Sequence, residues 1–358
     1  MKKYDIIGIM SGTSLDGLDI AMVNFQFDDY WKFDIYSYQA IPYDADTIEK
    51  LSNAIALSGF ELKKLDIDYG TWIGKQVKQF IDRQHFKPDL IVSHGHTVFH
   101  QPENGITLQI GDGYEILKST GIKTISDLRS LDVSLGGQGA PLVPIGDKLL
   151  FNEFDLCLNL GGFSNISFDS NEERIAFDIC PVNTVLNRLS NKLDKPFDQD
   201  GELAKSGITN SELFDRLNAL SYYKERPPKS LGIEWVLKHI IPMLKQETPE
   251  NLLNTFCHHI AYQITSSTID FTKQMAENHK PKMLITGGGA KNTFLIELIN
   301  KKAKDKFEIV IPDEKIVDYK EAIIFAFLGL LRSLGKNNTL KSVTGAQRDS
   351  SGGVIYES

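Results

Sequence analysis

The stretch IGIMSGTSLDGLD, residues 7–19, gathers side chains suited to hold a phosphate together with a cation. Glycines let backbone amides approach an anion, and the hydroxyls of residues 11–14 add further donors. Asp16 and Asp19 repel a bare phosphate, but they suit a Mg²⁺ ion that accompanies one. The Gly-Lys-Ser/Thr ending of a Walker loop is missing. A tight turn with aspartate as a local acceptor is the simpler alternative.

A second candidate turn is TGGGAKN, residues 286–292. Gly287, Gly288 and Gly289 follow an apolar strand and precede a helical pattern, so a flat ligand can lie against bare backbone there. The start of the following helix favours anions. The alternative is an ordinary turn from strand to helix, in which the glycines only make the backbone conformation accessible.

Asp178 is the candidate general base, since it ends the strand RIAFD just before a helix. A carboxylate at a strand end is well placed for proton transfer, although helix capping explains the same spacing. Arg129 follows another strand end and can bind an oxyanion or a carboxylate, or pair with Asp127 or Asp132. Glu321 begins an apolar helix and therefore faces either solvent or a polar crevice.

Three histidines, His94, His96 and His100, lie within seven residues. Their spacing is not that of a conventional zinc site, and no thiol or carboxylate completes a ligand set. Hydrogen bonding to a substrate at a strand end is the favoured interpretation.

The elements that position these residues repeat a pattern. Strands at 4–10, 18–27 and 31–41 form one triplet, and strands at 155–160, 164–168 and 174–179 form another. In both, the first strand stops at a glycine-containing polar turn, which indicates an internal duplication; chance similarity of two meanders is the competing explanation. Elsewhere helix and strand alternate, which predicts α/β layers with largely parallel sheets.

Composition fits a globular protein of two domains, with 358 residues, 41% hydrophobic and 24% charged. The net charge of −8 argues against nucleic acid or an anionic membrane as partner. No apolar run is long enough to span a bilayer, and no signal peptide is apparent. Three cysteines without a framework spacing predict reduced, mostly buried thiols and a cytoplasmic location.

The motifs together resemble the anhydro-N-acetylmuramic acid kinase family. The N-terminal stretch is similar to the family's phosphate loop, and the likeness continues in order through SHGHTVFHQP, QIGDG, TGIKTISDLRSLDVSLGGQGAPLVP, NLGGFSNIS, FDICPVN, DQDGELAKSG, TGGGAKN, KEAIIFAFLG and SVTGA. One departure is residues 178–183, DICPVN here, where the family usually has Asp-Thr-Gly-Pro-Gly-Asn.

The resemblance implies two related actin-like (ribonuclease H-like) domains with an interdomain cleft for ATP and sugar. It also implies ATP- and Mg²⁺-dependent conversion of 1,6-anhydro-N-acetylmuramic acid to N-acetylmuramic acid 6-phosphate, by a homodimer in cytoplasmic cell-wall recycling. By the same resemblance Asp178 is the catalytic base, and His96, Arg129 and Glu321 bind the sugar. The residues expected to bind the nucleotide are Gly12, Thr13, Ser14, Leu15, Asp16, Gly17, Leu18, Asp19, Gly287, Gly288 and Gly289, with Asp16 and Asp19 near Mg²⁺.

We place the first domain at residues 1–135 plus about 337–358 and the second at 136–336, with the glycine-rich stretch 136–141 as the crossing. Two other functions stay open. The first is a catalytically weakened sugar-binding or sensor protein on the same fold, suggested by the altered residues after Asp178. The second is an enzyme of this fold that acts on a different sugar.

Overall fold

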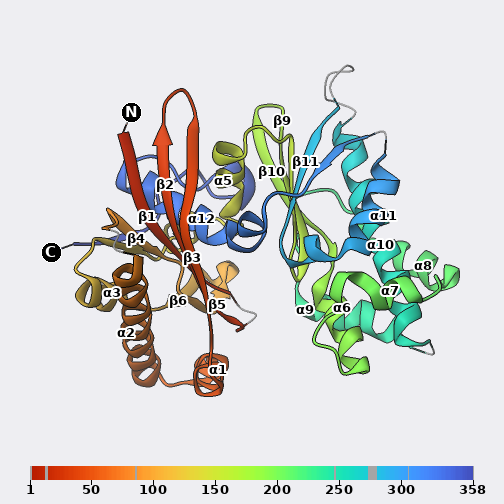
Figure 1. Ribbon diagram of the computed structural model, residues 1–358, viewed down its shortest axis with the longest axis horizontal. Coiled ribbons are helices and arrows are strands. Elements are labelled where there is room, and N and C mark those ends of the chain that lie inside the picture. The colour runs from red at the N-terminus through yellow and green to blue at the C-terminus, as the bar shows by residue number, and fades with distance from the viewer. Residues whose placement is uncertain are drawn as a thin grey trace. The chain divides into compact units, whose positions relative to one another are not determined.

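A six-stranded sheet forms the framework of unit 1, which comprises Met1–Leu150 and Tyr319–Ser358 of the computed structural model (Figure 1). The structure describes residues 2–12, 15–84, 87–245, 247–272, 280–304 and 306–357. The sheet has the order β13-β7-β4-β1-β2-β3. Its strands are β1 (Lys2–Ser11), β2 (Gly17–Phe27), β3 (Trp31–Pro42), β4 (Leu90–Ser93), β7 (Thr124–Ser126) and β13 (Val354–Tyr356).

The strands β1, β2 and β3 run antiparallel, and β4 and β7 then follow parallel to β1. A separate hairpin consists of β5 (His96–Gln101) and β6 (Ile106–Ile110). The α-helices of unit 1 are α1 (Ala45–Ser52), α2 (Gly59–Gln84), α3 (Gly113–Thr120), α4 (Ser130–Ser134), α5 (Val143–Leu150) and α13 (Lys341–Thr344), together with most of α12 (Glu314–Ser333).

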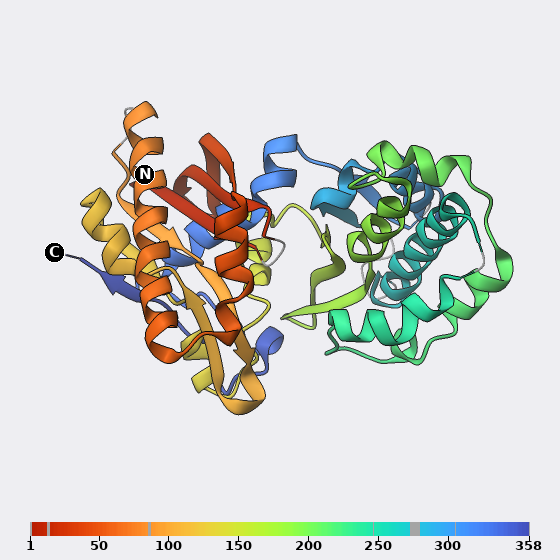
Figure 2. The same ribbon diagram turned by 90° about the horizontal axis from the view of Figure 1, so that it is seen from below.

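Helix α2 covers one face of this sheet (Figures 1 and 2). It begins with a capping box, because the Glu61 carboxylate accepts from the Ser58 amide at 3.0 Å and the Ser58 hydroxyl accepts from the Glu61 amide at 3.3 Å. Its buried side chains recur at helical spacing and include Ile73, Val77 and Phe80. They pack with alternate residues of β1 and β2 in one core.

Helix α12 lies against the other face of unit 1's sheet. A Cβ atom on Gly8 of β1 would come within 1.9 Å of the Ala322 carbonyl oxygen, so only glycine allows this approach. Gly146 of α5 in turn packs against Ile324 of α12. Residues 136–150 and 319–336, assigned to the second domain from the sequence, therefore belong to unit 1, and so does the glycine-rich stretch 136–141.

Unit 2, Phe151–Asp318, is built on a five-stranded sheet of order β10-β9-β8-β11-β12. Its strands are β8 (Leu156–Leu160), β9 (Phe163–Ser170), β10 (Glu173–Pro181), β11 (Lys282–Thr286) and β12 (Glu308–Val310). The first three run antiparallel, and β11 and β12 follow parallel to β8. This is the arrangement of β1, β2, β3, β4 and β7, so the expected duplication of an α/β unit is confirmed.

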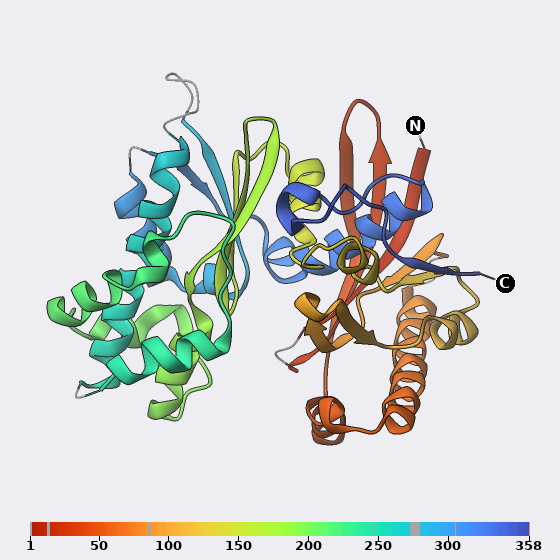
Figure 3. The ribbon, with the colours of Figure 1, turned by 180° about the vertical axis from the view of Figure 1, so that it is seen from behind.

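Helices gather on one side of unit 2's sheet in the views from the front and from behind (Figures 1 and 3). They are α6 (Asn183–Ser190), α7 (Glu202–Ser206), α8 (Ser211–Asn218), α9 (Ile233–Trp235), α10 (Pro249–Thr272) and α11 (Thr293–Ala303). Short turns of 3₁₀ helix lie at Ala54–Ala56, Pro102–Asn104, Asn191–Leu193, Gln199–Gly201, Ser221–Lys224, Ile241–Met243 and Gly288–Lys291, and a π turn at Val236–Ile240.

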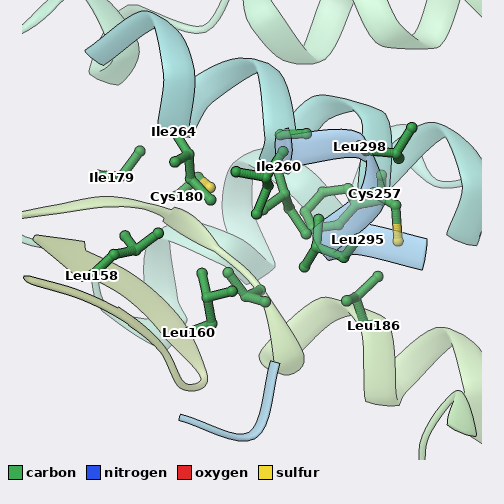
Figure 4. Close-up of a cluster of buried hydrophobic side chains, with 14 of the residues drawn as sticks. Leu158, Leu160, Ile179, Cys180, Leu186, Cys257, Ile260, Ile264, Leu295 and Leu298 are labelled. Carbon is green, nitrogen blue, oxygen red and sulfur yellow. The ribbon is translucent and has the colours of Figure 1, made fainter. Parts of the chain in front are cut away.

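All three cysteines of the chain lie in unit 2, where each is a buried free thiol: Cys157, Cys180 and Cys257. Figure 4 shows Cys180 and Cys257 among the leucine and isoleucine side chains of this core. Within the part of the chain that the structure describes, no helix combines the length and apolarity needed to cross a membrane.

Candidate active site

The turn between β1 and β2 carries the phosphate-loop residues expected from the sequence. Thr13 and Ser14 lie outside the described residues. Leu15 has a left-handed backbone with φ 58°, and its amide donates to the Gly12 carbonyl oxygen at 3.5 Å. Asp16 is exposed, and its carbonyl oxygen accepts from the Tyr43 amide. The described part of this turn is therefore tight and keeps one carboxylate on the surface.

The first residues of β2, which follows the turn, differ in their surroundings. The side chain of Leu18 is fully buried in the core beneath α2, so that side chain is structural. Gly17 lies so close to β3 that a Cβ atom would meet the Ile41 carbonyl oxygen at 2.5 Å. Asp19 pairs across the strands with Met10.

Asp19 lies on the same face of the sheet as Gly8. Gly8 and Met10 are two residues apart on β1 and so share a face, and Asp19 shares that face because it is the cross-strand partner of Met10. That is the face on which Ala322 of α12 lies. Glu321, the residue before Ala322, has an exposed side chain, and partial desolvation of its carboxyl by the surrounding protein raises its pKa. The charge of Arg129 opposes this rise, and that of Asp16 adds to it. Unit 1 therefore concentrates carboxylates near the turn between β1 and β2.

A buried cluster of three hydroxyls supports the start of this turn. Ser11 Oγ lies 2.8 Å from the Tyr43 hydroxyl and 2.9 Å from the Tyr69 hydroxyl, and the two tyrosine hydroxyls are 2.7 Å apart. Ser11 is 1% exposed. Its hydroxyl is thus engaged inside the protein, and the donors available to a ligand must come from residues further along the turn.

His94 orients Arg129. Arg129 Nε donates to His94 Nε2 at 2.9 Å, and Arg129 Nη1 donates to the Gly139 carbonyl oxygen at 2.7 Å. Because His94 Nε2 accepts, its proton resides on Nδ1, which donates to the Gly95 carbonyl oxygen at 2.8 Å. Burial, with the charge of Arg129, lowers the pKa of His94 to about 3, so the ring stays neutral.

Arg129 forms no ion pair with Asp127 or Asp132, in contrast to one alternative from the sequence. The carboxylate of Asp127 accepts from the Ser130 amide, and that of Asp132 accepts from Gly139 and Thr344. Burial lowers the pKa of Arg129 to about 10, which leaves it charged at neutral pH. The guanidinium is therefore held in place by neutral acceptors and keeps a positive charge for an anionic or polar ligand.

His96 is 5% exposed, and its Nδ1 has no hydrogen-bond partner within the protein. A buried polar nitrogen without a partner is costly, so it is well suited to bond a ligand. Burial lowers the pKa of His96. Among the described residues no group of three or more His, Cys, Asp or Glu side chains is placed to hold a metal ion.

In unit 2, Asp178 lies on β10 at an irregularity in its pairing with β9. Its carboxylate accepts from the Leu231 amide at 2.8 Å. Burial raises the pKa of the Asp178 carboxyl to about 6, and the Leu231 hydrogen bond opposes the rise. The residue preceding α6 is Val182, and Asp178 does not cap that helix. Such a carboxyl is largely ionised at pH 7 and still basic enough to accept a proton.

The residues that depart from the family after Asp178 lie in the core of unit 2. Ile179, Cys180 and Val182 are each at most 1% exposed, and Figure 4 shows Ile179 and Cys180 beside Ile260 and Ile264 of α10. The Ser164 hydroxyl accepts from the Cys180 amide at 3.1 Å and lies 3.0 Å from its carbonyl oxygen, which fixes this bend. The substitutions therefore change packing and leave the carboxylate of Asp178 outside that core.

The glycine turn of unit 2 follows β11. Gly287 has φ 82° and ψ 165°, a conformation open to glycine alone, and a Cβ atom there would lie 2.4 Å from Asn159 Oδ1. A Cβ atom on Gly289 would lie 2.8 Å from the Leu160 Cβ, whereas Gly288 has only Asn183 Nδ2 nearby, at 3.6 Å. Gly287 and Gly289 are thus required by close packing, and Gly288 presents bare backbone.

We expect Gly287→Ala to lower the free energy of unfolding by about 1–3 kcal/mol, because alanine is strained at this φ and ψ. Chemical denaturation of the two proteins measures the difference. Gly59→Ala is the matched control, because a Cβ atom at Gly59 meets nothing within 4 Å. Equal stability of Gly287→Ala and the parent protein would contradict this account of the turn.

The strand order that both units share is that of the ribonuclease H-like domains of actin, hexokinase and Hsp70, a fold class of ATP-dependent phosphotransferases and ATPases. Residues 4–358 match the family model described as anhydro-N-acetylmuramic acid kinase. The chain therefore belongs to the anhydro-N-acetylmuramic acid kinase family. It is a kinase that uses ATP, in cell-wall sugar recycling.

Curated relatives agree with this assignment. The anhydro-N-acetylmuramic acid kinase of Vibrio cholerae is 33% identical, over 98% of this chain and 97% of the relative. That of Pasteurella multocida is 34% identical, over 98% and 96%. Among solved structures, xylulose kinase from Rhodospirillum rubrum matches with a TM-score of 0.44 at 10% identity, covering 93% of this chain and 90% of that one.

Proposed function

We propose that the protein opens the 1,6-anhydro ring of 1,6-anhydro-N-acetylmuramic acid with water and phosphorylates the oxygen that is released. In this sugar O6 is bonded to C1, so no free hydroxyl exists at C6. Water adds to C1 as the C1–O6 bond breaks, O6 bonds to the γ-phosphorus of ATP, and ADP leaves. The products are N-acetylmuramic acid 6-phosphate and ADP.

Asp178 is the proposed general base that takes the proton from this water. The observation that carries the proposal is its carboxyl, whose pKa burial raises to about 6 and whose orientation the Leu231 amide fixes. A base with a pKa near the working pH is the most effective proton acceptor. Arg129, Glu321 and His96 are the proposed sugar-binding residues.

We assign the nucleotide to the two glycine-containing turns, residues 12–19 and 287–289. Asp16 and Asp19 have the oxygen donors that Mg²⁺ prefers, and this ion typically uses one or two carboxylates together with substrate phosphates. A bound Mg²⁺ would neutralise charge on the transferred phosphoryl group. Dimerisation and a cytoplasmic location, both implied by the family, remain part of the proposal.

The protonation of Asp178 sets the expected pH dependence. Because the active form is the carboxylate, kcat/KM should fall about tenfold per pH unit below about 6 and level off above pH 7. Initial rates from pH 4.5 to 8.5 at subsaturating sugar measure this profile. A flat profile across pH 6, with the fold intact by circular dichroism, would contradict the assignment.

Heavy-oxygen water tests the reaction itself. The label should enter the C1 hydroxyl of the sugar phosphate and not the phosphate group, and mass spectrometry of fragments separates the two positions. N-Acetylmuramic acid 6-phosphate kept in labelled water for the same time measures non-enzymatic exchange at C1. Label in the phosphate group would exclude water attack at C1.

The alternative of a catalytically weakened sugar-binding or sensor protein was suggested by the residues that follow Asp178. Ile179, Cys180 and Val182 are core side chains, and the Asp178 carboxylate keeps its bond from the Leu231 amide beside them. The same assay decides between the two functions, because a sensor binds the sugar without producing ADP.

A further inference from the structure

The segment from Tyr222 to Leu231 forms several hydrogen bonds with Asp178. The Tyr222 hydroxyl donates to the Asp178 carbonyl oxygen at 2.7 Å, and the Asp178 amide donates to the Lys229 carbonyl oxygen at 3.1 Å. With the Leu231 amide on the carboxylate, three residues of one segment fix the backbone and the side chain of Asp178. Anything bound beside Asp178 therefore also meets this segment.

Lys229 places an ammonium group in this segment without an anionic partner. Its Nζ donates to the Tyr222 carbonyl oxygen at 3.1 Å and lies 4.5 Å from the centre of the Tyr222 ring and 5.9 Å from that of Phe177. Among the residues that the structure describes, no carboxylate lies within 4.0 Å of this Nζ. An ammonium has three donors, and one of them bonds the Tyr222 carbonyl oxygen.

Burial raises the pKa of the Asp178 carboxyl, and the hydrogen bond from the Leu231 amide opposes this rise. Lys229 is half-buried, and burial lowers its pKa although the charge of Glu225 opposes this. A half-buried cation without a hydrogen-bonded carboxylate is stabilised when a ligand supplies one.

We propose that Lys229 binds the carboxylate of the sugar substrate and so selects an acidic anhydro sugar over a neutral one. The proposal rests on the proposed function, in which the substrate is a muramic acid and carries one carboxylate. Lys229 belongs to the segment that bonds the proposed base, because the Asp178 amide donates to the Lys229 carbonyl oxygen. The transferred phosphate is the other anion in this reaction. The experiment distinguishes it from the sugar carboxylate through the KM for ATP.

The test compares 1,6-anhydro-N-acetylmuramic acid with 1,6-anhydro-N-acetylglucosamine, which lacks the carboxylate. Lys229→Met should weaken binding of the acidic sugar about 10- to 100-fold, the range of a charge-assisted hydrogen bond. Affinity for the neutral sugar and the KM for ATP should change less than about twofold, so the preference between the sugars collapses. Lys229→Arg should restore most of the preference for the acidic sugar, because the positive charge is retained.

Lys224→Met is the matched control, since Lys224 is an exposed lysine of the same segment. The substitution at Lys229 leaves its carbonyl bond to Asp178 available, and circular dichroism checks the fold. An equal loss of affinity for both sugars would overturn the proposal in favour of a structural role of Lys229. A raised KM for ATP would overturn it in favour of phosphate binding. Unchanged affinity for the acidic sugar would also overturn it.

Calorimetric titration of each sugar separates this inference from the proposed function. If the parent protein binds the acidic sugar selectively and Lys229→Met does not, the inference stands even when no sugar phosphate forms. If sugar phosphate forms and Lys229→Met behaves as the parent, only the inference fails.

Discussion

Asp178→Asn is expected to lower kcat by about 10²- to 10⁴-fold while leaving the fold and nucleotide affinity unchanged. An asparagine side-chain oxygen can still accept from the Leu231 amide, so the local structure persists. The amide cannot take a proton from water, so the step at C1 loses its base. Coupled measurement of ADP and sugar phosphate gives kcat, and nucleotide titration gives the affinity.

Asp215→Asn is the matched control, because Asp215 is an exposed carboxylate on α8 of the same unit. It should retain the parent rate. Near-normal turnover by Asp178→Asn would remove this residue from the mechanism, and the pH dependence through pH 6 would then need another group.

Asp19→Ala should lower turnover about 100-fold at millimolar Mg²⁺, with partial recovery as the Mg²⁺ concentration rises. Asp19 lies on the sheet face that α12 covers, close in sequence to the phosphate-loop turn, and it is half-buried. Loss of a carboxylate that holds the cation lowers its affinity, whereas loss of a structural carboxylate would not respond to Mg²⁺. Measurement of the rate against Mg²⁺ concentration at fixed ATP distinguishes a carboxylate that holds the cation from a structural one.

Asp16→Ala should show the same Mg²⁺ response in smaller measure, because Asp16 is exposed. Asp29→Ala, at the distant β2–β3 turn, is the control. Unchanged turnover and unchanged Mg²⁺ dependence in both Asp16→Ala and Asp19→Ala would exclude these carboxylates from the cation site.

Much of the fold could be predicted from the sequence because the strands of both triplets are rich in β-branched and aromatic residues. The strand expected at 31–41 is β3, Trp31–Pro42. The sequence pattern does not predict helix α5, since Pro144 and Gly146 both weaken a helical pattern. Proline is tolerated in a first turn, and Gly146 is required where Ile324 packs against it.

The position of a candidate group near a strand end was predictable, as for Asp178 in β10. The contacts that orient such groups were not, because they join residues far apart in sequence through atoms that no motif specifies. His94 bonds Arg129 through one ring nitrogen, and Tyr222 and Leu231 hold Asp178 largely through backbone atoms. The alternatives of an Arg129 ion pair and of a helix cap at Asp178 are decided by contacts in the folded chain.

The confinement of every cysteine to the interior of unit 2 gives the protein a built-in chemical reporter. A thiol reagent reacts with the thiolate, and burial raises the pKa of Cys180 to about 12, so the folded unit protects it twice, by access and by ionisation. Labelling then requires that the core of unit 2 open, and unit 1 contributes no signal at all. The labelling rate with and without nucleotide or sugar thus reads the opening free energy of one half of the molecule, in the unmodified chain.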